Sequence, residues 1–174
     1  FLKPLQTGTA RGDSDVGTVT AYCKTLDPGA SGQLTCKVLY NWPEPVSPHV
    51  AAAKANDAPS DSDFCGSVTE ALDSLKSDLT LVETAGGVLS PAASGTSQAD
   101  LYKRVEALRD VVLVGDGRLG GISTTMTSLE SLERRPFNIK GIVLIQSEDG
   151  VGNADYLSSH WSAGPLLALP SLPI

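Results

Sequence analysis

The stretch Leu79-Thr80-Leu81-Val82-Glu83-Thr84-Ala85-Gly86-Gly87 runs from an apolar segment into a carboxylate and then into a pair of glycines. An unbroken apolar run predicts a buried strand of a parallel sheet, and ligands collect beyond the carboxyl ends of such strands. Glu83 would lie at that edge and offer the hard oxygen donor that Mg²⁺ prefers, while Gly86 and Gly87 let backbone N–H groups approach an anion. The stretch indicates a phosphate and metal site, and an acid before an ordinary glycine turn is the alternative interpretation.

The composition suits one globular domain, because the chain has 174 residues and 41% of them are hydrophobic. The formal net charge of -7 argues against a protein that binds nucleic acid or anionic membranes, since both need a basic surface. No apolar stretch approaches the ~20 residues of a membrane span. Cys23, Cys36 and Cys65 are odd in number and form no C-x-x-C pair, so they indicate neither a disulfide framework nor a zinc site. We therefore expect a soluble protein of a reducing, intracellular compartment.

Short apolar runs alternate with polar, helix-like segments, which is the pattern of βαβ units. The runs that we expect to form strands are 79–82, 111–114, 139–145 and 166–169. Apolar residues at helical spacing predict crossover helices at 70–76 and 126–135. Phe1-Leu2 is expected to be the end of a further strand that Lys3-Pro4 terminates. The sequence thus predicts an α/β domain with a mostly parallel sheet flanked by helices.

The sequence contains no G-x-x-x-x-G-K-[ST] phosphate-binding loop, although it begins within an expected strand and without a Met. We therefore expect that the natural protein has residues before Phe1.

Several blocks of sequence occur in the order and at the separations that dethiobiotin synthetases show. They are residues 1–8 (FLKPLQTG), 47–49 (SPH), 82–91 (VETAGGVLSP) and 115–123 (GDGRLGGIS). The chain therefore resembles this family over nearly its whole length, and most of all the synthetase domain of the eukaryotic bifunctional enzyme, which is fused to a diaminopelargonic acid aminotransferase. The resemblance implies a P-loop NTPase-like fold, with the first strand and the phosphate loop upstream of Phe1. It also implies that residues 1–174 are a single synthetase-like domain truncated at both ends.

The family closes the ureido ring of dethiobiotin, in biotin synthesis, from 7,8-diaminononanoate, CO₂ and Mg-ATP. A carbamate of one substrate amine is phosphorylated, and the second amine then displaces phosphate. The resemblance thus implies an enzyme, a cyclo-ligase, that uses ATP and Mg²⁺ and pairs into a homodimer. It implies a mitochondrial location if the eukaryotic likeness holds, and a cytoplasmic one otherwise. This chain alone is expected to be incomplete for catalysis.

The resemblance assigns catalysis to Lys3, whose charge would lie between the carbamate and the γ-phosphate. The alternative for Lys3 is a solvated lysine at a strand end. Thr7 matches a hydroxyl that contacts the substrate, and Asp15 is assigned to Mg²⁺ together with Glu83. Asp13 is a rival of Asp15 for the metal, and either aspartate could instead cap a helix.

The same resemblance assigns the remaining contacts to glycine-rich turns. The substrate carboxylate is received across the dimer interface, at the start of a helix, by Gly120, Gly121, Ile122 and Ser123. The nucleotide and its phosphates are contacted by Glu83, Gly86, Gly87, Arg118 and Pro170. Bacterial members usually carry Lys in place of Arg118 and Asn in place of Ser123, so the side-chain contacts differ there. Gln146 lies near the place of their adenine-contacting Asn, and His49 is more simply a structural histidine than a general base.

Two other classes of function compete with this interpretation. One is another P-loop ATPase, of the ParA or cobyrinate amidase type, which shares such strand ends but not the block 1–8 together with 47–49. The other is a domain without a phosphate loop that serves only for dimerisation or scaffolding in a biotin-pathway fusion protein. The residues before Phe1 would discriminate between an enzyme and a scaffold.

Overall fold

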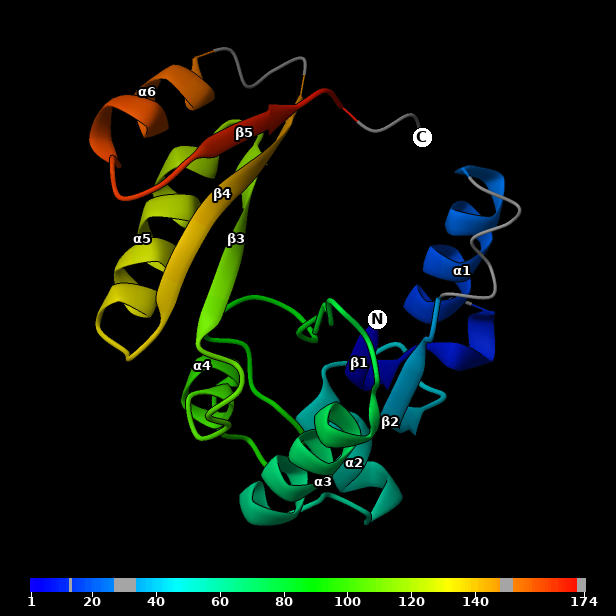
Figure 1. Cartoon of the computed structure of the whole chain (residues 1–174). Coiled ribbons are helices and arrows are strands. Elements are labelled where there is room, and N and C mark those ends of the chain that lie inside the picture. The colour runs from blue at the N-terminus through cyan, green and yellow to red at the C-terminus, as the bar shows by residue number, and fades with distance from the viewer. Residues whose placement is uncertain (13, 27–33, 148–151, 172–174) are drawn as a thin grey trace. The chain divides into compact units, whose positions relative to one another are not determined.

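The computed structural model describes residues 1–12, 14–26, 34–147 and 152–171 (Figure 1). The chain divides into two compact units, Phe1–Ala107 and Leu108–Ile174, which we call unit 1 and unit 2. In both units strands alternate with helices, and the neighbouring strands β1–β2, β3–β4 and β4–β5 all pair in parallel. The predicted α/β class with parallel sheets flanked by helices is therefore confirmed. Its description as one domain truncated at both ends stays a prediction.

Unit 1 contains a two-stranded parallel sheet, β1–β2, with helices around it. Its elements are β1 (Leu2–Thr7), the 3-10 helix η1 (Thr9–Arg11), α1 (Asp15–Leu26), β2 (Lys37–Trp42), α2 (Pro48–Ala55), α3 (Asp61–Ser74) and α4 (Gln98–Tyr102). Helix α3 begins nine residues before the predicted helix at 70–76, because Ser60 caps it: its Oγ accepts a hydrogen bond from Asp63 N at 3.1 Å. The buried core of unit 1 includes Leu2, Leu5, Phe64, Val68 and Leu101.

Strand β1 is longer than predicted, since it continues through Lys3-Pro4 to Thr7. Leu2 N donates to Leu81 O at 2.8 Å and Leu2 O accepts from Glu83 N at 2.9 Å, so Leu2 bonds to the segment 81–83. Successive residues of a strand direct their N–H groups to opposite sides, so the missing N–H of Pro4 lies on the side of Leu2. Among the described residues, pairing on that side ends at Glu83, and β1 pairs with β2 both before and after Pro4, at Lys3 and at Leu5.

The predicted strand at 79–82 is wrong. Only Val82 forms a bridge, with Leu2, and Leu79 and Leu81 are 74% and 61% exposed. A strand inside a parallel sheet has a neighbour on each side and a covered face on each side. The described residues give this segment one neighbour, β1, so the apolar run is neither fully paired nor buried. Glu83 nevertheless follows the bridge directly, as the sequence predicted.

Unit 2 is a three-stranded parallel sheet in the order β3–β4–β5. Its elements are β3 (Asp110–Gly117), α5 (Gly121–Glu133), β4 (Asn138–Gln146), α6 (Asn153–His160) and β5 (Leu166–Leu169). The three predicted strands at 111–114, 139–145 and 166–169 are confirmed. Helix α5 begins five residues before the predicted helix at 126–135, because Gly120, at φ 87°, starts it directly after the turn that follows β3.

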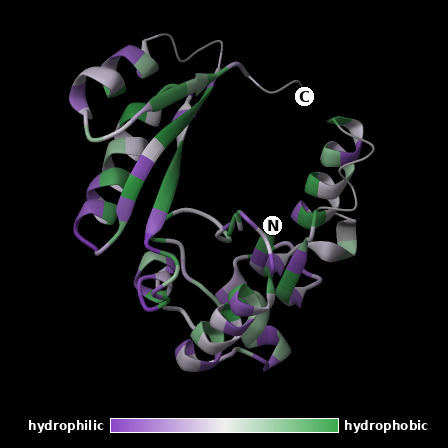
Figure 2. Ribbon diagram, viewed as in Figure 1, coloured by the Kyte–Doolittle hydropathy of each residue, from purple (hydrophilic) through white to green (hydrophobic). Residues whose placement is uncertain are grey.

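The helices of unit 2 pack on one face of this sheet (Figure 1). Leu113, Ile142 and Leu144 are buried, whereas Val114 and Leu167 are 66% and 56% exposed. Much of each strand is apolar, as the green colour in Figure 2 shows, and the helices of unit 2 cover only one face of the sheet. Among the described helices of the whole chain, none is long and apolar enough to cross a membrane.

Glycine at position 117 is required by the close approach of two strand ends. A Cβ there would lie 2.2 Å from Ile145 O, so Gly117→Ala should lower the free energy of unfolding of unit 2 by about 1–3 kcal/mol. Gly66→Ala is the matched control: Gly66 lies within α3 with open space around it, and alanine there should stabilise unit 1 by about 0.5–1 kcal/mol. Urea unfolding, followed by the fluorescence of Trp161 in unit 2 and Trp42 in unit 1, checks both. A Gly117→Ala protein as stable as wild type would contradict this packing.

Candidate functional site

A buried lysine in β1 lies between two carboxylates. Lys3 is only 5% exposed, and its Nζ is 2.7 Å from both Asp15 Oδ2 and Glu83 Oε1. The ammonium also donates to Thr84 O at 3.1 Å. A charge taken out of water must be paired, and these oxygens provide the partners. The interpretation of Lys3 as a solvated surface lysine is therefore wrong, and the structure brings Lys3, Asp15 and Glu83 together.

Asp15 is the first residue of α1, and its carboxylate is not used to cap that helix. The neighbouring Ser14 Oγ accepts from Gly17 N at 3.2 Å, which is the usual cap interaction. Asp15 N donates to the Gln6 side chain of β1 at 3.3 Å, which holds the start of the helix near the strand. The rival metal ligand Asp13 lies outside the described residues.

Asp15 and Glu83 are suitable ligands for a magnesium ion. Their side chains are 44% and 47% exposed, and an oxygen of each approaches the same cation, the Lys3 ammonium. The ammonium thus marks a position at which both carboxylates meet a positive charge. Within the described residues, no group of three or more His, Cys, Asp and Glu side chains surrounds a metal position. Two carboxylates, completed by phosphate oxygens and water, are the usual way in which proteins hold Mg²⁺.

The turn after Glu83 presents backbone N–H groups to solvent. Gly86 has φ 96°, and a Cβ there would lie 2.9 Å from Ser90 Oγ, so the turn requires glycine. Thr84 Oγ1 donates to Gly86 O at 2.8 Å, and Ser90 N donates to Gly87 O at 2.9 Å. Gly86 and Gly87 are exposed, and neither N–H donates a hydrogen bond within the described part of the chain. Such free N–H groups can bind an anion.

Thr7 and His49 are less directly connected to this site. Thr7 ends β1, four residues after Lys3 on the same face of the strand, which places it about 13 Å along the strand at ~3.3 Å per residue. The structure therefore does not bring Thr7 beside Lys3. His49 lies in the first turn of α2, where its Nδ1 is 3.0 Å from Ser47 Oγ. This contact favours the structural interpretation of His49.

In unit 2 the predicted carboxylate-binding residues form the start of α5. Gly120 precedes the helix with φ 87°, and Gly121 N donates to Arg118 O at 2.9 Å. A Cβ on Gly121 would lie 1.9 Å from Asp116 O, so the turn is closed by backbone contact. Ile122 is half-buried and Ser123 is exposed in the first helical turn. Free N–H groups and the helix dipole favour an anion at such a helix start.

The turn that leads into α5 carries an ion pair. Arg118 Nη2 lies 2.7 Å from Asp116 Oδ2, and Arg118 N donates to Asp116 Oδ1 at 2.9 Å. The hydrogen bonds from the Arg118 side chain and backbone lower the pKa of Asp116 to about 2. Arg118 is 76% exposed and directs its charge to Asp116, so its contact with a phosphate stays a prediction.

A cleft of about 330 Å³ lies at the carboxyl ends of β3 and β4. It is lined by Val114, Gly115, Asp116, Arg118, Ile145, Gln146 and Ser147. Its volume is in the range of small-molecule sites, and its position matches the ligand sites of open α/β sheets. Ile145 pairs with Leu169, so Pro170, which follows β5, lies at the same edge of the sheet as Gln146.

Two buried polar residues that support these turns were not predicted. Asn153, 7% exposed at the start of α6, donates through Nδ2 to Arg118 O at 2.9 Å. Gln98, 1% exposed at the start of α4, donates through Nε2 to Ala85 O at 3.2 Å. Both are single polar residues in ordinary helical segments, and no sequence pattern distinguishes them from solvated ones.

Comparison with known proteins gives consistent matches. A family described as "AAA domain" matches residues 1–174. The chain is 38% identical to the bifunctional dethiobiotin synthetase/adenosylmethionine-8-amino-7-oxononanoate aminotransferase of Emericella nidulans, which aligns with 99% of this chain and 21% of that protein. It is 42% identical to the mitochondrial bifunctional dethiobiotin synthetase/7,8-diamino-pelargonic acid aminotransferase of Arabidopsis thaliana, over 81% of this chain and 18% of the relative.

The chain therefore spans about a fifth of the length of these bifunctional relatives. A shorter relative, the ATP-dependent dethiobiotin synthetase BioD of Wolinella succinogenes, is 30% identical over 94% of this chain and 74% of its own length. Because the AAA-domain match covers every residue and this relative is aligned over most of its length, the chain belongs to the dethiobiotin synthetase family of AAA-domain proteins.

Proposed function

We propose that the protein containing this chain is an ATP- and Mg²⁺-dependent dethiobiotin synthetase. One amine of 7,8-diaminononanoate adds to CO₂ and forms a carbamate, whose oxygen attacks the γ-phosphorus of ATP and releases ADP. The second amine then attacks the carbamoyl carbon. The bond between that carbon and the phosphorylated oxygen breaks, phosphate leaves, and the ring closes as the amines lose protons to water. The observation that carries the proposal is the buried Lys3 ammonium between Asp15 and Glu83.

Charge is the central difficulty of this reaction, because an anionic carbamate must meet an anionic phosphate. Lys3 would place a positive charge between the two groups, and the N–H groups of Gly86 and Gly87 would bind phosphate oxygens beside it. Asp15 and Glu83 would hold Mg²⁺, which supplies charge neutralisation at the phosphates. A buried ion pair is poor support for stability alone, since apolar replacements are often at least as stable. Because stability alone does not explain the buried Lys3 ion pairs, they favour an active site over a purely scaffolding domain.

Lys3 and the metal would share the same two carboxylates, so they cannot occupy one position together. With Mg²⁺ held by Asp15 and Glu83, the buried ammonium would need another anion, which the γ-phosphate and the carbamate would provide. Metal and nucleotide should therefore bind together, each improving the affinity of the protein for the other.

Unit 2, taken by itself, has two further features that would bind ligands. The start of α5, from Gly120 to Ser123, would receive the substrate carboxylate from the partner subunit of a homodimer. The cleft beside Gln146 would hold the nucleotide base, with Arg118 and Pro170 at its edge. The bifunctional relatives support a fused aminotransferase, and the plant relatives named mitochondrial support a mitochondrial location. The phosphate loop expected upstream of Phe1 stays a prediction.

The full-length protein should consume ATP only when diaminononanoate and bicarbonate are both present, because carbamate is the acceptor and water is excluded from the site. Lys3→Ala should lower kcat by about 100-fold or more, as loss of a charge-stabilising donor does. Lys54→Ala, which removes an exposed ion pair with Glu44, should leave kcat unchanged and serves as the control. A coupled assay of ADP release checks these rates. ATP hydrolysis that is equally fast without the diamine would contradict the proposed reaction.

Removing the lysine should create metal affinity in the absence of nucleotide. Lys3→Met keeps the length of the side chain but leaves Asp15 and Glu83 without their cation, so Mg²⁺ should raise the Tm of this variant. Wild type and Lys54→Met, measured at the same Mg²⁺ concentrations, should show little increase in Tm. If Lys3→Met responds no more than wild type, the two carboxylates do not form the metal site.

The homodimer can be tested by complementation. A Lys3→Ala protein mixed with a Ser123→Trp protein should recover about a quarter of wild-type sites, since half of the random dimers are mixed and each keeps one intact site. Ser123 is exposed, so tryptophan is tolerated by the isolated fold. Activity should be measured after subunit exchange has been verified by native mass spectrometry. Activity equal to the sum of the separate components would place the whole site within one chain.

A further inference from the structure

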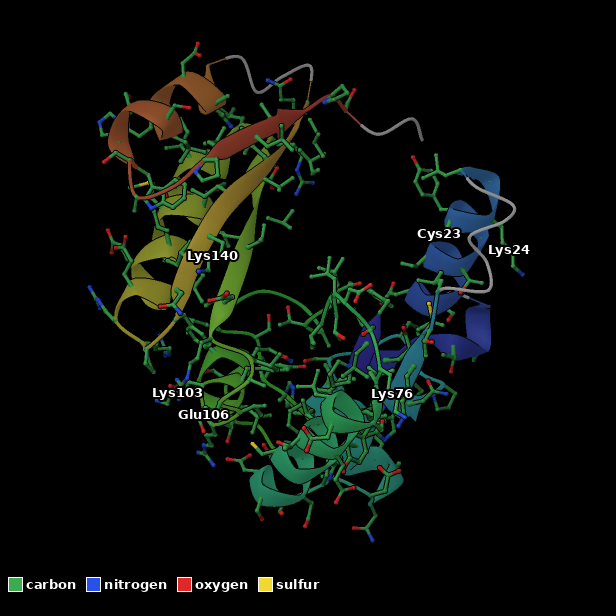
Figure 3. All side chains as sticks on the ribbon, in the orientation of Figure 1. Cys23, Lys24, Lys76, Lys103, Glu106 and Lys140 are labelled. Atoms are coloured by element: carbon green, nitrogen blue, oxygen red, sulfur yellow. The ribbon has the colours of Figure 1, made fainter. Side chains whose placement is uncertain are left out.

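Gln98 is a buried side chain that the proposed mechanism does not use. It begins α4 and is 1% exposed, and its Nε2 donates to Ala85 O at 3.2 Å. Its Oε1 is buried and has no hydrogen-bond partner within the described part of the chain. The helix ends close by, at the segment that Lys103 and Glu106 mark in Figure 3.

The backbone around Gln98 holds the same turn. Gln98 N donates to Ser90 O at 2.8 Å, and Ala99 N donates to Val88 O at 3.0 Å. The first N–H groups of a helix have no partner inside the helix, and here carbonyls of the glycine turn accept them. The start of α4 is therefore fastened to the segment 85–90 through both backbone and side chain.

Stability alone does not explain an amide at this position. Leaving a buried acceptor unsatisfied costs free energy, and an apolar side chain of the same shape would remove that cost. Gln98 makes one side-chain hydrogen bond and leaves its Oε1 unpaired. A methionine or leucine would fill the same space without the unpaired Oε1, at the loss of the single hydrogen bond to Ala85 O, so the two effects on stability offset each other. The amide is thus better explained by what it does to Ala85.

The contact with Ala85 determines where the next N–H group points. A peptide unit is planar and trans, so the carbonyl of one residue and the N–H of the next point in opposite directions. With Ala85 O held by Gln98, the N–H of Gly86 points away from Gln98. Gly86 is exposed and its N–H has no acceptor within the described part of the chain. Glycine resists rotation of this peptide unit less than other residues, so an external restraint is useful here.

We infer that Gln98 is a positioning residue that orients the Ala85–Gly86 peptide so that the Gly86 N–H faces a nucleotide phosphate. The inference rests on the proposed function, in which this turn binds phosphate. Gln98 itself contacts no substrate; it acts through the carbonyl of Ala85. Nucleotide affinity and protein stability should therefore respond differently to its replacement.

Three full-length proteins test the inference: wild type, Gln98→Met and Ser97→Ala. Ser97 caps the same helix through Oγ, which accepts from Asp100 N at 3.2 Å, whereas the side-chain hydrogen bond to Ala85 O comes from Gln98. Gln98→Met should raise the Kd for the magnesium complex of a non-hydrolysable ATP analogue about tenfold, measured by calorimetry, with a Tm close to that of wild type. Ser97→Ala should lower Tm and leave that Kd unchanged. In kinetics, Gln98→Met should raise the KM for ATP and change kcat at saturating ATP less than twofold.

An unchanged Kd in Gln98→Met would overturn the positioning role while the proposed function stands. An equal rise of Kd in Ser97→Ala would also overturn it, because the effect would then follow helix stability. A wild-type protein that does not bind this ATP analogue would overturn the proposed function, and with it the phosphate-binding role of the turn. If Gln98→Met does not fold, Gln98→Leu gives the same comparison, and failure of both to fold would show a structural role and overturn the inference.

Discussion

The buried ammonium of Lys3 is the interaction on which the arrangement of unit 1 depends. It joins three segments that are distant in sequence: strand β1, the start of α1 with Asp15, and the turn that Glu83 opens. A cation in this environment cannot remain unpaired, so the two carboxylates are held where a metal ion would also need them. One electrostatic requirement of the folded protein thus arranges the charges that the proposed phosphoryl transfer to a carbamate would require.

The glycine turns of the two units are each held in a fixed conformation, but by different contacts. In unit 1, Gly86 adopts a positive φ and the neighbouring helix α4 holds the turn through Gln98. In unit 2, Gly117 and Gly121 allow backbone atoms to approach so closely that no side chain fits, and Asn153 bonds to the carbonyl between them. In each unit glycine allows the backbone conformation of the turn, and a buried side-chain amide from a later helix restrains the backbone of that turn. An anion bound at such a turn would depend on both the glycine and the amide.

Much of the fold could be predicted from the sequence where burial is decided locally. The runs at 111–114, 139–145 and 166–169 form strands because they pair with one another inside unit 2. The run at 79–82 looks the same in sequence, but its burial depends on neighbours that the described residues do not provide. Pro4 misled the prediction of β1 because the effect of a missing N–H depends on which side of the strand it faces.

The site could be predicted only in part. Glu83 was found from the apolar run that precedes it, whereas Lys3 and Asp15 were found through the family resemblance. The convergence of the three side chains explains why those residue types occur together. Gln98 and Asn153 were missed because a helical Gln or Asn has the same appearance in sequence whether it is solvated or bonded to a backbone carbonyl. The family resemblance assigned Thr7 and Lys3 to the same substrate, but the length of strand between them separates the two side chains.

The ion pair at the end of β3 has a consequence for how the protein responds to acidity. With its pKa lowered to about 2, Asp116 keeps its negative charge throughout the range in which cells operate. The stability that this depressed pKa contributes is present above the ordinary pKa of an aspartate and is lost only as the pH falls toward the lowered value. The turn before α5 therefore exchanges no proton near neutrality. A ligand that reaches this turn near neutrality would meet a surface whose charge stays constant.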